Sequence, residues 1–189
     1  MKKLIFLLIF LVKISTARSA QTVIFFNEKS AGPTDRAAVA TLQDFLEKMT
    51  GQRPRVVWDV QPRSGARVIF VENNPFLADF GLKMPDFIPN DGFFIESKYG
   101  ATLLAGVGEH GLEHAVFAFL EKLGCRKFSP RDSVLPKLAP GWTTPKIAPT
   151  LEKPAFAWRE LHYQNAFDEG FARWHGLLQN SEKREKWGL

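Results

Sequence analysis

The fold of this chain is decided by residues 91–128, which read DGFFIESKYGATLLAGVGEHGLEHAVFAFLEKLGCRKF. Two β-rich runs, residues 92–96 and 101–105, flank a short polar turn, as in a β-hairpin. A helix is predicted after the second run, because apolar residues recur there at helical spacing on one face. These residues are Leu112, Val116, Phe119, Leu120 and Leu123. A brief strand, residues 125–128, is expected after the helix.

Three glycines between the second strand and the helix allow a nucleotide-binding interpretation. Gly106, Gly108 and Gly111 have the G-x-G-x-x-G spacing of the Rossmann fingerprint, whose backbone amides approach a pyrophosphate at a helix N-terminus. Asp132 follows at about the distance of the ribose-binding acid in that motif. The glycine-bearing strand is, however, the second arm of a predicted hairpin, and no further βαβ units follow. Nucleotide binding therefore ranks third among the predicted functions, and we expect no cofactor.

The same stretch contains the inverted zinc-peptidase motif H-x-x-E-H at His110, Glu113 and His114. Such a site needs two imidazoles one helical turn apart and a glutamate base. At about 100° per residue, the two histidines lie opposite the apolar stripe of the helix. A buried catalytic zinc is hard to build on that face. The pattern therefore favours two solvated histidines near a helix start and no metal.

A resemblance accounts for the glycines without a nucleotide. The stretch resembles the end of the small α/β domain that precedes the catalytic barrel in several glycoside hydrolases. The domain is similar to that of family 20 β-hexosaminidases and family 67 α-glucuronidases, and especially to large secreted bacterial proteins of uncharacterised function. The family usually has an aromatic-glycine pair where this chain has His114-Ala115. The residues that match the pattern are Gly111, Val116, Phe119, Leu120, Glu121, Leu123, Gly124, Cys125, Arg126, Phe128 and Pro130.

The first part of the chain completes an α/β domain over residues 21–129. A strand at 22–26, a helix at about 35–50 and a strand at 55–60 form a right-handed crossover unit, which makes the two strands parallel. Since the later hairpin is antiparallel, we predict a mixed sheet with both helices on one face, a two-layer α+β sandwich. The connection at 73–90 is predicted to tuck over the sheet edge, with an aromatic platform for sugar rings as the alternative. The first helix should bury Ala38, Leu42, Phe45, Leu46 and Met49.

Residues 1–20 have the composition of an export signal. Lys2 and Lys3 precede an apolar run at 4–12 that is too short to span a bilayer, and small residues follow. We expect cleavage and a secreted or periplasmic bacterial protein that has no membrane contact afterwards. The whole chain has 25 Lys+Arg and 20 Asp+Glu, and residues 1–20 hold four of the basic residues and no acid. After cleavage, 21 basic and 20 acidic residues would remain, a net charge of +1. This charge predicts no nucleic-acid partner.

The last third of the chain changes character twice. Six prolines between 130 and 154 predict an extended linker along a surface, and we place the domain boundary there. A strand at 156–161 and a helix at about 167–179 are expected within the segment 155–189. In the resembled family, an aromatic-Arg-Glu run after a proline marks the first strand of a (β/α)₈ barrel, and Pro154 with Trp158-Arg159-Glu160 fits that run.

The resemblance implies substrate-binding roles for Arg159, Glu160 and His162, because barrel sites lie at the carboxyl ends of strands. A salt-bridged arginine at a domain junction is the alternative for Arg159. No catalytic residue is assigned, since glycosidases need two carboxylates across the scissile bond and these would lie on later barrel strands. A lone cysteine excludes an internal disulfide, and Cys125 is expected to be a packed thiol.

These expectations describe a truncated chain, namely the non-catalytic N-terminal accessory domain and first barrel segment of a secreted glycoside hydrolase that acts in carbohydrate degradation. Glycoside hydrolysis is thus predicted by resemblance alone, and carbohydrate would be bound through the barrel. The alternative from another class is a free-standing carbohydrate-binding or scaffold module. A self-sufficient module should not end in an unpaired Trp-rich strand and helix, so we prefer the accessory domain.

Overall fold

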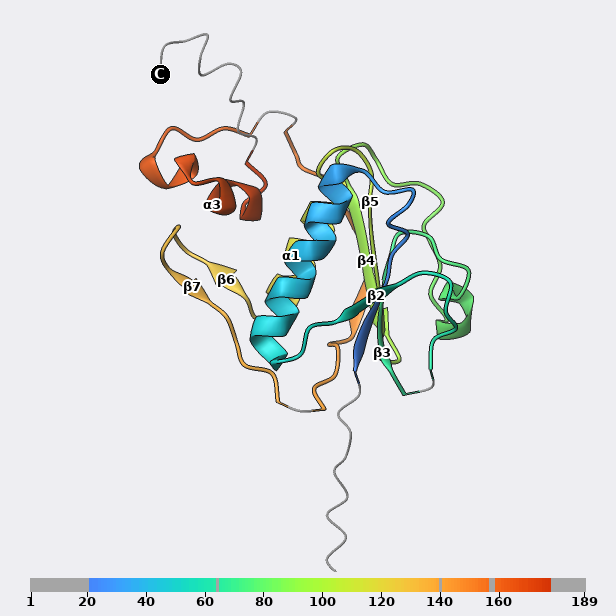
Figure 1. The fold of residues 1–189 in the computed structure, drawn as a ribbon. Helices are drawn as coiled ribbons and strands as arrows, with labels where there is room; N and C mark the ends of the chain where they lie inside the picture. The colour runs from blue at the N-terminus through green and yellow to red at the C-terminus, as the bar shows by residue number, and fades with distance from the viewer. Residues whose placement is uncertain (1–20, 64, 140, 157–158, 178–189) are drawn as a thin grey trace, which may run out of the picture.

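The computed structural model describes residues 21–177 except residues 64, 140 and 157–158 (Figure 1). The predicted export signal therefore lies outside the described residues. The described chain contains a six-stranded mixed sheet in the order β2-β1-β3-β5-β4-β8. Its strands are β1 (Thr22–Phe25), β2 (Arg55–Val57), β3 (Arg67–Val71), β4 (Phe93–Lys98), β5 (Ala101–Gly106) and β8 (Ile147–Glu152). Two helices, α1 (Pro33–Thr50) and α2 (Gly111–Lys122), pack on one face of it.

The sheet has the mixed pairing that the sequence predicts. β1 pairs in parallel with both β2 and β3, and β3 pairs in parallel with β5. β4 and β5 form the antiparallel hairpin, in which Phe94 lies opposite Ala105. The fold class is thus α/β, with the α+β arrangement of two helices on one face of a mixed sheet, as predicted.

Local sequence explains where α1 begins and ends. Pro33 occupies the first helical turn, where its missing N–H costs nothing, and the Asp35 carboxylate accepts the N–H of Gly32 at 3.1 Å. Gly51 ends the helix with φ 75°, a left-handed conformation that glycine adopts without strain. The predicted apolar faces of both helices meet in one core. Its fully buried helix residues include Ala38, Leu42, Leu46, Met49, Leu112, Val116, Phe119 and Leu120.

The other face of the sheet is covered by the connection between β3 and β4. This segment includes the short helix η1 (Leu77–Phe80), which lies on the side of the sheet opposite α1 (Figure 1). Phe76 packs against Phe25, and Phe80 packs against Phe70, with ring centroids 6.4 and 5.4 Å apart. The connection was predicted to lie over the sheet edge, but it forms a second apolar layer under the sheet. These two rings are therefore part of a core and not a platform for sugars.

The proline-rich segment differs from the predicted surface linker. Its last part, β8, pairs antiparallel with β4 and becomes an edge strand of the sheet. The pairing register shifts between Ile95 and Ser97 of β4, which pair with Thr150 and Ile147 of β8. Pro149 lies in β8 between these two partners. Proline is tolerated at such a place, because an edge strand at a bulge need not donate every backbone N–H. In the described residues of its first part, the one regular element is β7 (Ser133–Val134), which pairs with β6 (Arg126–Lys127).

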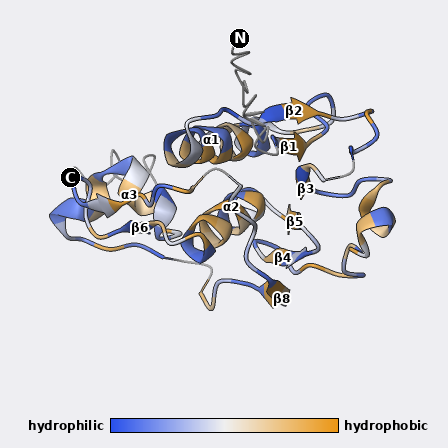
Figure 2. Cartoon of the chain, turned by 90° about the horizontal axis from the view of Figure 1, so that it is seen from below, coloured by the Kyte–Doolittle hydropathy of each residue, from blue (hydrophilic) through white to orange (hydrophobic). Residues whose placement is uncertain are grey.

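The segment after β8 also differs from its prediction. The described residues between 155 and 161 form no strand, so the predicted barrel strand is wrong for them; residues 157–158 lie outside the described chain. A short helix η2 (Gln164–Phe167) leads into α3 (Glu169–Trp174), which falls within the predicted helix. Figure 2 shows α3 beside β6 and α2, on the side of the helices away from the sheet. Within the described residues, no helix is long and apolar enough to cross a membrane.

Candidate functional site at the outer face of α2

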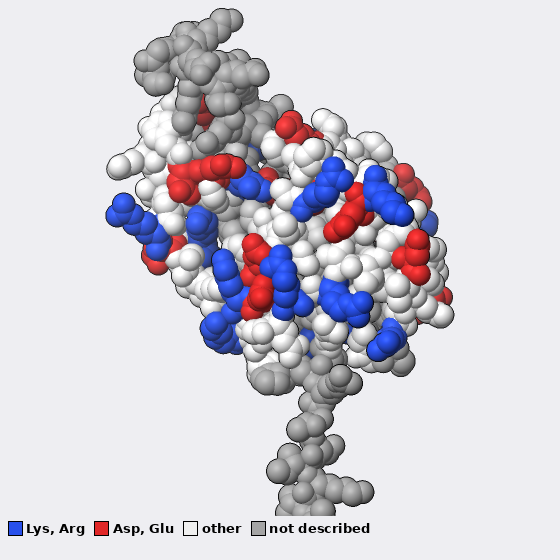
Figure 3. Space-filling model, viewed as in Figure 1, with Lys and Arg blue, Asp and Glu red and all other residues white. Residues whose placement is uncertain are grey.

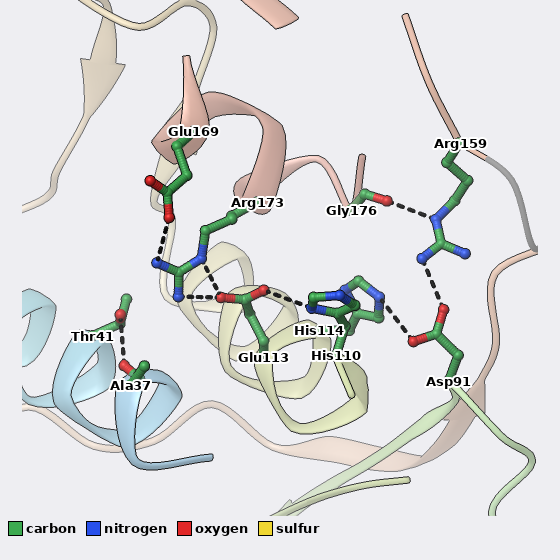
Figure 4. A network of polar contacts seen from close by, with 10 residues as sticks. All are labelled: Ala37, Thr41, Asp91, His110, Glu113, His114, Arg159, Glu169, Arg173 and Gly176. Atoms are coloured by element: carbon green, nitrogen blue, oxygen red, sulfur yellow. Dashed lines mark hydrogen bonds and ion pairs between the residues drawn. The ribbon is translucent and has the colours of Figure 1, made fainter. Parts of the chain in front are cut away.

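Four of the residues that the sequence singled out gather on the outer face of α2. The start of α2 carries His110, Glu113 and His114, and the chain after β8 crosses over them (Figure 4). That later segment contributes Arg159 and Arg173, each of which meets an acidic side chain of the sheet domain. We refer to these five residues and Asp91 as the junction.

Asp91 and Arg159 form the first ion pair of the junction. Arg159 Nη2 lies 2.8 Å from Asp91 Oδ2, and only 14% and 24% of the two side chains are exposed. Arg159 also donates from Nε to the Gly176 carbonyl at 2.6 Å and from Nη1 to the Phe156 carbonyl at 2.8 Å. The guanidinium thus joins the loop before β4 to both ends of the segment 156–176.

Glu113 and Arg173 form the second ion pair. Arg173 Nε donates to Glu113 Oε1 at 2.6 Å, Nη2 contacts the same oxygen, and Glu169 Oε1 lies 3.7 Å from Nη1. The Glu113 side chain is 8% exposed. Burial is the largest influence on it and favours the neutral acid, but the hydrogen bonds and charges of His110 and Arg173 outweigh burial and lower the pKa of Glu113. Glu113 is therefore held as a carboxylate.

The prediction of two solvated histidines is wrong, because the segment after β8 covers the face on which they lie. The His114 side chain is only 11% exposed, and burial lowers its pKa, although Asp91 at 4.0 Å opposes that shift. Gly176, at φ 63°, lies against the His114 ring. His110 is less covered, and its hydrogen bond with Glu113 raises its pKa against the effect of burial.

The H-x-x-E-H residues do not converge on a common point. The two imidazole centroids are 6.3 Å apart, and Glu113 is directed at Arg173 and His110. Within residues 21–177, as far as the structure describes them, no group of three His, Cys, Asp or Glu side chains has metal-binding geometry. The arrangement therefore serves to neutralise and orient two arginines.

An aromatic contact accompanies the two ion pairs. Trp174 inserts between the helices, with ring centroids 5.6 Å from Phe45 and 5.0 Å from Phe117. Its indole N–H donates to Glu121 Oε1 at 3.2 Å. The sequence predicted Trp174 on a helix but gave it no role. The combination of Phe171 and Trp174 at i, i+3 is the signal that an apolar helix face needs a partner.

The three predicted substrate-binding residues are not brought together by a common strand end. Arg159 occupies the junction, which is the salt-bridged alternative that the sequence left open for it. Glu160 is half-buried and His162 is exposed, both in irregular backbone. Their roles toward a substrate remain a prediction.

The glycines of the fingerprint have a packing role. A Cβ on Gly106 would overlap the carbonyl carbon of Gly111, and a Cβ on Gly111 would lie 2.6 Å from the carbonyl oxygen of Gly92. The start of α2 therefore contacts the backbone of the hairpin directly, as only glycine permits. Asp132 lies in the β6–β7 turn, where its carbonyl accepts the N–H of Phe128 at 2.9 Å.

A cleft of about 310 Å³ opens beside the junction, between α2, the end of β8 and α3. Its apolar walls include Phe93, Phe117 and Trp174, and its polar walls include His114, Lys153 and Arg159. Phe117 and Trp174 already contact each other across the two parts of the chain. The cleft is therefore the groove along which the segment after β8 lies on the domain.

Comparison with known proteins gives structural likenesses only. No protein-family model matches the chain, and no curated protein sequence matches it. Among solved structures, it is similar to part of a family GH115 4-O-methyl-α-glucuronidase with specificity for decorated arabinogalactans (17% identity, 75% of this chain and 18% of that one, TM-score 0.48). It is also similar to part of a Streptomyces plicatus β-hexosaminidase (16%, 75% and 23%, TM-score 0.47).

A third likeness is to a GH20 exo-β-N-acetylglucosaminidase from Vibrio harveyi (12% identity, 75% of this chain and 17% of that one, TM-score 0.40). Family 20 is thus among the neighbours, as the sequence motif predicted, whereas the α-glucuronidase belongs to family 115 and not to family 67. The chain spans less than a quarter of the length of these structures. The similarity concerns the fold and not the chemistry.

Proposed function

We propose that this chain is a non-catalytic accessory domain of a secreted glycoside hydrolase-type protein, and that it holds the following segment of the chain in a fixed orientation. The resemblance of residues 91–128 to the domain that precedes a catalytic barrel supports the family. The lysines and apolar run of residues 1–20 support export to the periplasm or the exterior.

The observation that carries the orienting role is the pair of arginine–carboxylate contacts. Arg159 and Arg173 come from the segment after β8, whereas Asp91 and Glu113 come from the sheet domain. Buried ion pairs add little net stability compared with apolar packing, but breaking one partner costs about 3–5 kcal/mol because a buried charge is left unpaired. Such contacts therefore specify one arrangement of the two parts. Trp174 supplies the apolar contact that makes this arrangement stable.

The electrostatics of the junction favour a non-catalytic role. A glycosidase requires one carboxyl group that is protonated near neutral pH and a second carboxylate across the sugar. Asp91 and Glu113 are each bound by an arginine, and the pKa of Glu113 is lowered. Glu113 is therefore not suited to donate a proton to a leaving oxygen, and the Asp91 carboxylate is already engaged by Arg159.

An activity assay and a double-mutant cycle test the two parts of the proposal. The chain is incubated with an aryl β-N-acetylhexosaminide and with a 4-O-methylglucuronoyl aryl glycoside, beside a Glu160→Gln control. No turnover is expected; turnover that disappears in Glu160→Gln would contradict the non-catalytic role.

In urea unfolding, Asp91→Asn and Arg159→Gln should show a coupling energy of about 1–3 kcal/mol, as residues in one network do. Additive effects would contradict the orienting role.

A further inference from the structure

A second cavity, away from the junction, lies where two parallel strands end. It has a volume of about 540 Å³ and is lined by the end of β2 and by the residues that follow β1 and β2. Phe25 and Val57 are the last residues of β1 and β2 and are partners in a parallel pair. The chain therefore leaves both strands at the same, carboxyl-terminal end of the sheet. Ligands of open α/β sheets bind outside the carboxyl ends of strands, and ligand pockets typically measure about 300–1,000 Å³. Position and size therefore fit a ligand site.

The walls of this cavity are held by hydrogen bonds within the domain. Phe26 N–H donates to the Val57 carbonyl at 2.9 Å, which joins the two walls. In the loop after β1, Asn27 Oδ1 accepts the N–H of Lys29 at 3.2 Å. Arg36 of α1 donates to the Glu28 carbonyl at 2.9 Å. The backbone around the cavity is thus fixed by hydrogen bonds, so binding a ligand does not require the entropic cost of ordering a flexible loop.

The side chains of the cavity combine a flat aromatic surface with mixed polar groups. Trp58 is half-buried and lines the cavity, so its indole offers a rigid apolar face and one N–H donor. Asn27 and Ser30 are neutral, Lys29 donates, and the carboxylates of Glu28 and Asp59 accept.

This combination discriminates between classes of ligand. Two carboxylates against one ammonium group disfavour an anion such as phosphate or a uronic acid, and a wholly apolar ligand would leave the polar walls without partners. A neutral sugar has apolar C–H faces for the indole and hydroxyl groups that each donate and accept.

We propose that this cavity is a subsite for a neutral carbohydrate of one or two rings, anchored on Trp58. It shares no residue with the junction, so it does not rest on the accessory role. On the face that Figure 3 shows, basic and acidic side chains are interspersed over the domain and form no patch of a single sign. That surface is consistent with a neutral ligand and not with a polyanion.

Nuclear magnetic resonance of the ¹⁵N-labelled chain tests the proposal. Cellobiose, N,N′-diacetylchitobiose and β-1,4-galactobiose are titrated as neutral probes, and glucuronic acid and inorganic phosphate as anions. We expect at least one neutral disaccharide to shift the Trp58 indole signal and the amides of residues 27–30, with a dissociation constant of about 1 mM or tighter. Trp58→Ala should weaken binding at least about tenfold, as loss of an aromatic anchor does.

Matched variants keep the result interpretable. Trp58→Phe retains a flat ring and should bind within about threefold of the original chain, which also guards against a folding defect in Trp58→Ala. Tyr99→Ala removes an aromatic residue that is exposed in the β4–β5 turn, at the opposite end of the strands, and should leave binding unchanged. The proposal is overturned if no neutral probe shifts these signals at about 10 mM, if only the anions do, or if Trp58→Ala binds like the original chain.

Discussion

Replacing Glu72 by glutamine should make the protein less sensitive to pH. Glu72 follows β3 with φ 63°, its N–H donates to the Leu104 carbonyl at 2.8 Å, and its Oε1 accepts the N–H of Gly106 at 2.9 Å. Burial raises its pKa from 4.5 to about 7, the Gly106 hydrogen bond opposes the shift, and the charge of Asp35 adds to it. Glutamine keeps the acceptor atom for Gly106 but cannot ionise.

The raised pKa fixes the sign of the effect. A carboxyl group that holds its proton more tightly in the folded chain stabilises the fold fully below pH 4.5, and this stabilisation is lost as the pH rises through about 7. At 1.36 kcal/mol per pKa unit, the shift corresponds to an upper limit of about 3 kcal/mol. The true value should be smaller, because Glu72 is partly accessible to water.

Urea unfolding from about pH 4 to pH 8 measures this effect. The original chain should lose up to about 3 kcal/mol of unfolding free energy relative to Glu72→Gln across that range, and Glu72→Gln should be the more stable of the two at pH 8. Glu109→Gln removes an exposed carboxylate near the same turn and serves as the control. Parallel pH profiles for the original chain and Glu72→Gln would refute the reasoning.

Two further predictions concern the core. Phe119 is fully buried between the helices and the sheet, so Phe119→Ala should lower the free energy of unfolding by about 3–5 kcal/mol; a loss below about 1 kcal/mol in urea would contradict the packing. Burial raises the pKa of the Cys125 thiol to about 11, so iodoacetamide at pH 8 should alkylate it only after unfolding, and rapid labelling of the folded chain would contradict its place in the core.

Regular periodicity is what made the centre of the fold predictable. The hairpin consists of two β-rich runs around a polar turn, and both helices repeat their apolar residues at helical spacing, so local sequence specifies them. The crossover from β1 through α1 to β2 then followed from the handedness of such connections. The residues whose spacing predicts these elements are also the residues whose contacts stabilise them.

The edge strand β8 could not be predicted in the same way. Pro149 within it argues against a strand, and its burial pattern is mostly exposed. β8 exists because β4 offers an unpaired edge, which is a property of the assembled sheet. The same limit applies to residues 73–90, whose aromatic residues indicated burial but not which face of the sheet they cover.

The junction was partly visible in the sequence. A helical projection correctly separates the core face of α2 from the face that carries His110 and His114. It cannot indicate that a segment much later in the chain covers that second face. Arg159 was identified through a family pattern for a barrel strand, but the described residues around it form no strand. Its guanidinium instead forms an ion pair with Asp91. The acidic partner was absent from the prediction because the pair is brought together only by folding.

Hydrogen exchange in α3 tests the central claim most directly. The amides of Ala172 and His175 donate to the carbonyls of Asp168 and Phe171, and α3 is too short to persist alone in water. If the junction holds this segment on the domain, both amides are protected in the original chain and lose at least about tenfold of that protection in Asp91→Asn/Glu113→Gln, while the amides of β5 are unchanged. Free exchange of α3 in the original chain, or equal protection in the double variant, would contradict the account.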